Sequence, residues 1–112
     1  MDLSIYNTIK PDDNTAMSMF LMDNSISHSL HAVAMEQQGI GISVYPIDKM
    51  GKKELWLHNH NNMHQQEFTN LGLTGLPDLG EVDMGNSKDF FEWMQAHSLA
   101  HQTVDSALGI TP

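Results

Sequence analysis

The sequence contains no cysteine. Disulfide bonds, thiolate metal sites and a cysteine nucleophile are therefore all excluded. The absence does not indicate a redox compartment, because cysteine-free chains occur in reducing and oxidising surroundings alike. Any metal site in this chain must use nitrogen and oxygen donors.

Long apolar runs are also missing. No stretch approaches the ~20 apolar residues that a membrane-spanning helix needs. The N-terminal region, which includes Asp2, Lys10 and Pro11, lacks the basic start and apolar middle of a secretory signal. We therefore expect neither a membrane segment nor an export signal.

Basic side chains are few. Five Lys and Arg residues against 14 Asp and Glu residues leave a formal net charge of -9. Such a surface repels the phosphate backbone of nucleic acids and the head groups of anionic lipids. The composition therefore predicts no nucleic-acid partner and no membrane partner.

The length of 112 residues fits one domain, because two halves would each have too small a core. Residues 1–14 include Leu3, Ile5 and Tyr6 but show little helical periodicity. They are expected to form an N-terminal arm that packs on the core or on a neighbouring chain. Residues 15–112 are expected to form the helical domain.

An internal repeat is the most informative feature of the sequence. Moving the sequence along itself by 37 residues places identical residues on one another. The pairs are Trp56/Trp93, His60/His97, His64/His101, Gln65/Gln102, Leu71/Leu108, Gly72/Gly109 and Thr74/Thr111. The pattern W-x3-H-x3-H-Q-x5-L-G-[LI]-T thus occurs twice.

A fainter copy precedes these two. Moving the sequence by 33 residues places His31 on His64 and Gly39 on Gly72. Ser27 replaces the first histidine of the pattern in this copy. The sequence therefore predicts three repeat units of unequal quality.

The spacing within a unit is that of an amphipathic helix. His97, His101 and Val104 share one face with Trp93 at ~3.6 residues per turn. Each unit ends in glycine followed by Ile or Leu, and glycine adopts the left-handed conformation that closes a helix. We expect helices near residues 16–38, 53–71 and 87–108, within repeat units spanning about 16–40, 53–73 and 87–110. The predicted fold class is all-α: a small three-helix domain of repeated helix units with an extended N-terminal arm.

The histidines form the one constellation suited to chemistry. His60 with His64, and His97 with His101, stand four residues apart. This spacing turns both imidazoles of a pair to the same side of a helix, as in helical zinc and iron sites. Two facing pairs would supply four nitrogen ligands, and Glu67 would add a carboxylate.

A structural role is the alternative. A buried imidazole is satisfied by a hydrogen bond to a carbonyl, to a helix end or to an opposing histidine, without metal. The ligand set is not symmetric, because Val104 stands where the other unit has Glu67, and HExxH is absent. The sequence alone favours the structural role, so no metal and no cofactor is expected. His58 points away from the apolar stripe, and His28 receives no role.

Catalytic motifs are absent. The sequence has no G-x-S-x-G nucleophile elbow and no glycine-rich phosphate loop. The paired carboxylates Asp12 and Asp13 lie in a polar segment suited to solvent. We therefore expect that the protein is not an enzyme.

The repeated unit W-x3-H-x3-H-Q-x5-L-G-[LI], preceded by the acidic link over residues 79–83, resembles small virion structural proteins of tailed bacteriophages. The similarity covers residues 53–112. It implies a structural subunit of the neck, tail or ring that assembles with copies of itself into a homo-oligomer. Its further partners would be other virion proteins: portal, adaptor, tail or capsid. The expected location is the virion, and the host cytoplasm before assembly.

Two other function classes stay open. One is a metal-binding helical protein that uses the paired histidines for storage or redox chemistry. The other is an acidic adaptor or inhibitor, made during infection, whose surface mimics DNA. Bound metal would favour the first class, and a basic nucleic-acid-binding partner would favour the second.

Overall fold

The computed structural model describes residues 2–41 and 51–110. The chain forms a short 3-10 helix, η1 (Leu3–Tyr6), and three α-helices: α1 (Asn14–Gln37), α2 (Lys53–Asn70) and α3 (Ser87–Leu108). No strand occurs within these ranges, so the all-α class and the three predicted helices are confirmed. None of the helices found there combines the length and apolarity that crossing a membrane requires. The sequence between α1 and α2 includes residues 42–50, which lie outside the described residues.

Side-chain caps explain where α1 and α3 begin. Asp13 Oδ1 accepts a hydrogen bond from the backbone N–H of Ala16 at 3.0 Å. Asn86 Oδ1 accepts from the N–H groups of Lys88 and Asp89 at 3.0 and 3.1 Å. Each cap satisfies N–H groups that have no partner within the first turn of the helix.

All three helices end around a glycine. Gly39, Gly72 and Gly109 have φ values of 77°, 68° and 73°, in the left-handed region. The residue after each glycine donates its N–H to the carbonyl five residues earlier, at 2.8 Å in all three helices. This arrangement satisfies carbonyl groups at the end of a helix. The three predicted helix stops are confirmed.

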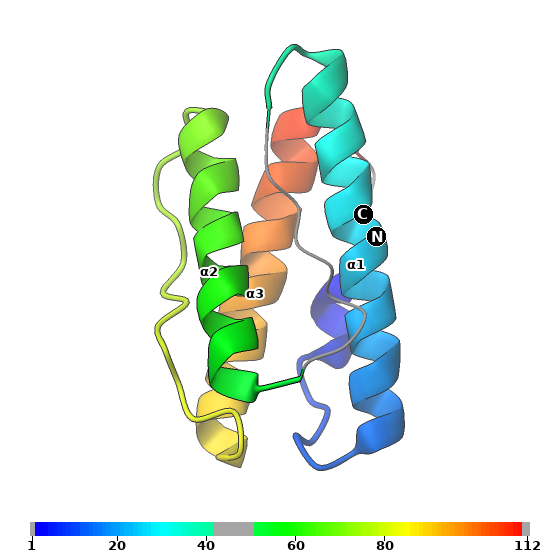
Figure 1. The fold of residues 1–112 in the computed structure, drawn as a ribbon, viewed down its shortest axis with the longest axis vertical. Helices are drawn as coiled ribbons and strands as arrows, with labels where there is room; N and C mark the ends of the chain where they lie inside the picture. Colours follow the sequence, from blue (N-terminus) through cyan, green and yellow to red (C-terminus); the bar gives the residue numbers. More distant parts are fainter. Residues whose placement is uncertain (1, 42–50, 111–112) are drawn as a thin grey trace.

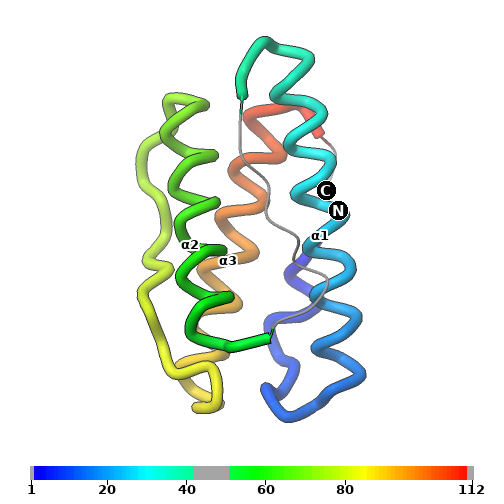
Figure 2. The backbone as a smooth tube through the Cα atoms, viewed as in Figure 1, coloured from blue at the N-terminus to red at the C-terminus, as the bar shows by residue number. Residues whose placement is uncertain are grey.

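The three helices run in the same direction. Figure 1 shows the N-terminal ends of α1, α2 and α3 at one end of the bundle and their C-terminal ends at the other. The connection from α2 to α3 must therefore return along the bundle, and residues 71–86 do so in an extended path beside α2 (Figure 2). An extended chain covers ~3.3 Å per residue against ~1.5 Å in a helix, so a short link suffices.

Parallel helices place equivalent residues of the repeat side by side. The residues of α1 that pack against α2 are, however, not the ones that the sequence repeat aligned. The predicted shift of 37 between α2 and α3 holds, because His60 meets His97. Between α1 and α2 the packed residues are 36 apart rather than 33, as in Asn24 and His60. The shift of 33 aligns only the ends of α1 and α2. α1 continues about one turn past the level at which α2 ends (Figure 1).

The N-terminal segment is part of the core and not an extended arm. Leu3 and Tyr6 of η1 are buried, and η1 contacts α1 and α3. The Tyr6 hydroxyl donates a hydrogen bond to Asp23 of α1. Ile5 remains exposed. Leu3 and Tyr6 therefore lose most of their contact with water within the same chain.

Candidate metal centre

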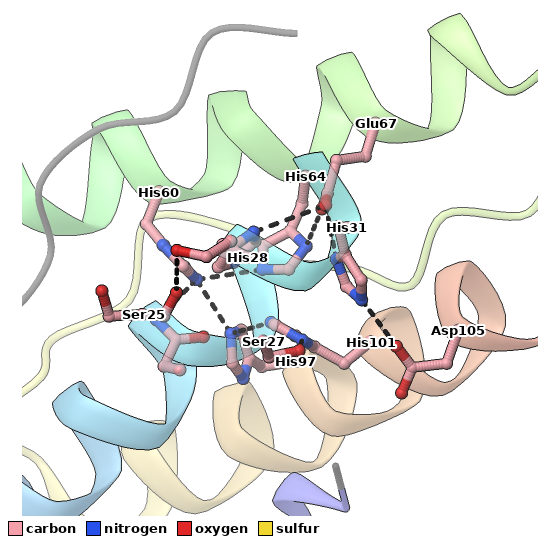
Figure 3. Close-up of polar contacts among 12 residues, drawn as sticks. Ser25, Ser27, His28, His31, His60, His64, Glu67, His97, His101 and Asp105 are labelled. Carbon is pink, nitrogen blue, oxygen red and sulfur yellow. Dashed lines mark hydrogen bonds and ion pairs between the residues drawn. The ribbon is translucent and has the colours of Figure 1, made fainter. Parts of the chain in front are cut away.

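The core between the three helices is polar toward their C-terminal ends. Six of the seven histidines are at most 1% exposed, and two carboxylates are buried with them. The residues are His28 and His31 of α1, His60, His64 and Glu67 of α2, and His97, His101 and Asp105 of α3 (Figure 3). Burial of so many polar groups is costly unless each finds a partner.

An aromatic layer closes this cluster on the side of the helix N-termini. Phe20, Trp56 and Trp93 contact one another pairwise, with ring centroids 5.7 to 6.4 Å apart. Trp56 stacks on His60 and Trp93 stacks on His97, each with centroids 4.6 Å apart. The indoles therefore orient the two imidazoles and keep that side of the cluster apolar.

Four imidazole Nε2 atoms meet between α2 and α3. The His60 and His97 Nε2 atoms are 2.8 Å apart. His64 Nε2 lies 2.9 Å from His60 Nε2, and His101 Nε2 lies 3.1 Å from His97 Nε2. These residues are the two predicted histidine pairs, here called the histidine tetrad. The structure brings the two pairs together and buries them.

His28 adds a fifth ring that sequence reasoning missed. Its centroid lies 4.8 Å from that of His64 and 4.6 Å from that of His101. Donor nitrogens of all five rings lie within 4.8 Å of one another. The available signal was the pattern F-x3-N-x3-H ending at His28, which repeats the spacing of W-x3-H-x3-H.

In two tetrad rings an oxygen atom lies close to Nδ1. Ser27 Oγ is 2.8 Å from His101 Nδ1, and Glu67 Oε1 is 3.1 Å from His64 Nδ1. An Nδ1–H of His101 directed at Ser27 leaves the His101 Nε2 lone pair facing the other rings, whereas the His64–Glu67 contact is close but does not have hydrogen-bond geometry. Glu67, predicted as an additional ligand of the tetrad, thus lies behind His64 and not among the Nε2 atoms.

His31 links the two buried carboxylates. Its Nδ1 lies 2.7 Å from Glu67 Oε2, and its Nε2 lies 2.6 Å from Asp105 Oδ1. Burial acts to lower the pKa of His31, but the hydrogen bonds with Asp105 and Glu67 outweigh it and raise the pKa to about 9. A protonated imidazole donates to both carboxylates at once. The sequence repeat had not indicated this pairing.

Glu67 is held in its charged form. Burial acts to raise its pKa, but the neighbouring His28, His31 and His64 outweigh that effect and keep the pKa well below its usual range. A carboxylate within reach of several imidazoles is favoured when ionised. The cluster therefore contains fixed negative charge next to its neutral rings.

Most of the central rings are uncharged. Burial, with repulsion between neighbouring imidazoles, lowers the pKa of His28 to about 4 despite the attraction of Glu67. The same causes lower the pKa values of His60, His97 and His101 well below the usual value. A neutral imidazole has a lone pair on one nitrogen, which is the form that binds transition metals.

The seventh histidine lies outside the cluster. His58 is exposed, as predicted, and its Nδ1 is 2.5 Å from Glu81 Oε1. It is on the same helix as two tetrad residues but on the solvent side. His58 therefore offers a matched control for experiments on the buried histidines.

No family model matches this sequence, and neither a curated protein nor a solved structure matches it. The resemblance to virion proteins therefore rests on its motif alone. What the polar core does has to be inferred from its donor atoms and their arrangement.

Proposed function

We propose that the protein binds metal, with the histidine tetrad holding one divalent transition-metal ion. The observation that carries the proposal is the convergence of four buried Nε2 atoms, with neighbouring separations of 2.8 to 3.1 Å. Nitrogen-rich sites suit borderline ions such as Fe²⁺, Co²⁺, Ni²⁺, Cu²⁺ and Zn²⁺. Ca²⁺ and Mg²⁺ prefer oxygen ligands and are not expected here.

Protons alone do not satisfy the tetrad. In neutral imidazole each ring nitrogen has either one N–H or one lone pair. His60 Nε2 contacts the Nε2 atoms of His64 and His97, and His97 Nε2 also contacts His101. Two of the three contacts can be ordinary hydrogen bonds, but the third then has no free proton and no free lone pair. A cation that accepts all four lone pairs removes this conflict.

The spacing of the tetrad also fits a metal ion. Metal–nitrogen bonds of ~2.0–2.1 Å place adjacent ligand atoms about 2.9 Å apart at right angles and about 3.3 Å apart in a tetrahedron. The observed 2.8, 2.9 and 3.1 Å lie near the right-angle value. Right angles are typical of five or six ligands, and His28 is the ring placed to supply a fifth.

Metal analysis of the purified chain tests this proposal. After exposure to Co²⁺ or Zn²⁺ and gel filtration, the chain should retain at least one ion, and chelator should lower its melting temperature. His97→Gln should lose the tetrad ion, whereas the matched control His58→Gln should keep it. Retention of no more metal by the wild type than by His97→Gln would overturn the proposal.

Assembly as the subunit of a larger particle is a second candidate function, supported by α1. Five large apolar side chains of this helix are 43% to 63% exposed. They are Met19, Met22, Ile26, Leu30 and Val33. Their separations of three or four residues place them in one stripe, as in helices that pair with another helix. α1 thus has a row of exposed apolar side chains in addition to its buried face, which is typical of a helix covered by a partner.

We infer that a second copy of the chain covers this stripe. The stripe contains no charged residue, so two chains of net charge -9 can meet there without bringing like charges together. A homo-oligomer of this kind is also what the resemblance to virion proteins implies. Light scattering should give a mass above that of one chain, and Leu30→Lys should reduce it. A monomeric wild type at high concentration would refute this second candidate.

A further inference from the structure

We propose that the core holds a second metal position beside the tetrad, formed by His28, His31 and Glu67, so that the chain carries a two-metal centre. This inference rests on the proposed function, because the second ion would neighbour the first. The donor atoms of the three residues lie within 4.8 Å of one another, and all three side chains are buried. Two imidazoles and one carboxylate suit Fe²⁺, Co²⁺ or Zn²⁺.

His28 is the first reason for a second ion. Neither of its ring nitrogens completes a hydrogen bond with the described residues, although the ring is 1% exposed. Its Nδ1 lies 3.4 Å from Glu67 Oε2, so this nitrogen is on the side of the second group. A single ion at the tetrad can engage only one nitrogen of this ring. A second ion on Nδ1 engages the other, and the N–H proton of the ring leaves to solvent, so that His28 bridges the two ions as an imidazolate.

Glu67 is placed to serve both positions. Its Oε1 is 3.1 Å from His64 Nδ1, a close contact with a tetrad ligand that does not have hydrogen-bond geometry. Its Oε2 is 2.7 Å from His31 Nδ1 and 3.4 Å from His28 Nδ1. One oxygen therefore lies beside a tetrad ligand, and the other converges with two imidazole nitrogens on a separate point.

His31 has the support that a ligating histidine needs. Metal-bound histidines almost always donate the other ring N–H to a carboxylate or carbonyl. The His31 Nε2–Asp105 Oδ1 distance of 2.6 Å supplies that contact and directs Nδ1 toward Glu67. In the metal-free protein a proton on Nδ1 joins His31 to Glu67. The incoming ion takes the place of this proton, which leaves to solvent.

The two positions differ in what they offer to a ligand. The coordination places of the tetrad ion are filled by protein nitrogens, and His28 is the neighbouring fifth ring. Three protein ligands at the second position leave at least one coordination place for water or another small ligand. Any ligand chemistry of this centre is therefore expected at the ion held by Glu67.

The test is the number of Co²⁺ ions per chain, measured by elemental analysis after gel filtration. We expect two ions in the wild type, one in Glu67→Gln, and two in Asp105→Asn with the second ion bound on the order of 10–100-fold more weakly. One ion in the wild type, kept in Glu67→Gln and lost in His97→Gln, would overturn the second position and leave the proposed function standing. No bound ion in the wild type would overturn both, and two ions in Glu67→Gln would overturn the assignment to Glu67.

A measurement on the unaltered chain covers the case in which Glu67→Gln fails to fold. Wild-type protein loaded with Cu²⁺ should give an electron paramagnetic resonance spectrum of two interacting ions, because the two donor groups adjoin one another. A spectrum of isolated Cu²⁺ at full loading would contradict the two-metal centre. Copper is the probe here because both donor groups are rich in imidazole.

Discussion

His31 Nε2 of α1 lies 2.6 Å from Asp105 Oδ1 of α3, across 74 residues of sequence. The backbone carbonyl of Asp105 also accepts the N–H of Ile110 at the end of α3, at 2.8 Å. One residue thus contributes its side chain to the buried cluster and its carbonyl to a helix end. The cluster and the C-terminal end of the bundle are therefore expected to be coupled in stability.

Asp105→Asn should destabilise the metal-free protein by about 1–3 kcal/mol, because it removes the charged acceptor of a buried imidazolium. The pKa of His31 should fall from about 9, since Asp105 is a principal cause of its rise. Chemical denaturation and a histidine NMR titration measure the two effects. Glu92→Gln, an exposed carboxylate change on the same helix, is the control and should alter neither. An unchanged His31 titration in Asp105→Asn would contradict the assigned contact.

The metal-free protein should lose stability in acid. The pKa of His28 is about 4 in the folded chain, against an unfolded value of ~6.5. The unfolded state therefore binds more protons between these values, so stability is complete above about pH 6.5 and falls as the pH drops toward 4. His60, His97 and His101 act in the same direction. Denaturation curves at pH 7 and pH 5 should show the loss, and equal midpoints would argue against neutral buried rings.

His31 should produce the opposite trend in alkali. Its folded pKa of about 9 lies above the unfolded ~6.5, so its contribution is complete below about pH 6.5. That contribution is lost as the pH rises toward 9, where the folded chain loses the proton. Denaturation at pH 9 should therefore show lower stability than at pH 7. Asp105→Asn should make this alkaline loss smaller, because the folded pKa of His31 in the variant is expected to lie closer to its unfolded value.

Gly72→Ala should cost about 1 kcal/mol of stability, because a side chain disfavours the left-handed conformation that ends α2. Nothing lies within 4 Å of a Cβ built at Gly72, so the penalty comes from its φ of 68° alone. Gly41→Ala is the control, because its surroundings are equally open and its φ is not in that region. Thermal melts compare the two. Equal melting temperatures for both variants would contradict the backbone argument.

Leu3→Ala should destabilise the fold by about 2–3 kcal/mol, as expected for a leucine removed from a packed core. Leu3 is 2% exposed, whereas its neighbour Ile5 is 67% exposed. Ile5→Ala should therefore have little effect on the monomer. Urea denaturation of both variants measures the difference. Equal effects would indicate that η1 does not pack on the core in solution.

Short-range features of the sequence determined the helices and their ends. The spacing of Trp93, His97 and His101 defines one helix face, and Gly72 stops a helix whatever lies across from it. The common orientation of the two imidazoles within each histidine pair also followed from spacing, because residues four apart face the same way. These interactions involve residues within a few turns of one another, so a linear pattern contains them.

The tertiary structure alone decided the register of α1 and hence the composition of the site. Similar helix ends suggested a shift of 33, but packing of Phe20 against Trp56 sets the shift at 36 and brings His28 beside His64. The parallel direction of the helices places His31 between carboxylates of two other helices. Helix ends depend on local backbone conformation, whereas register depends on how side chains from distant segments fill a shared core.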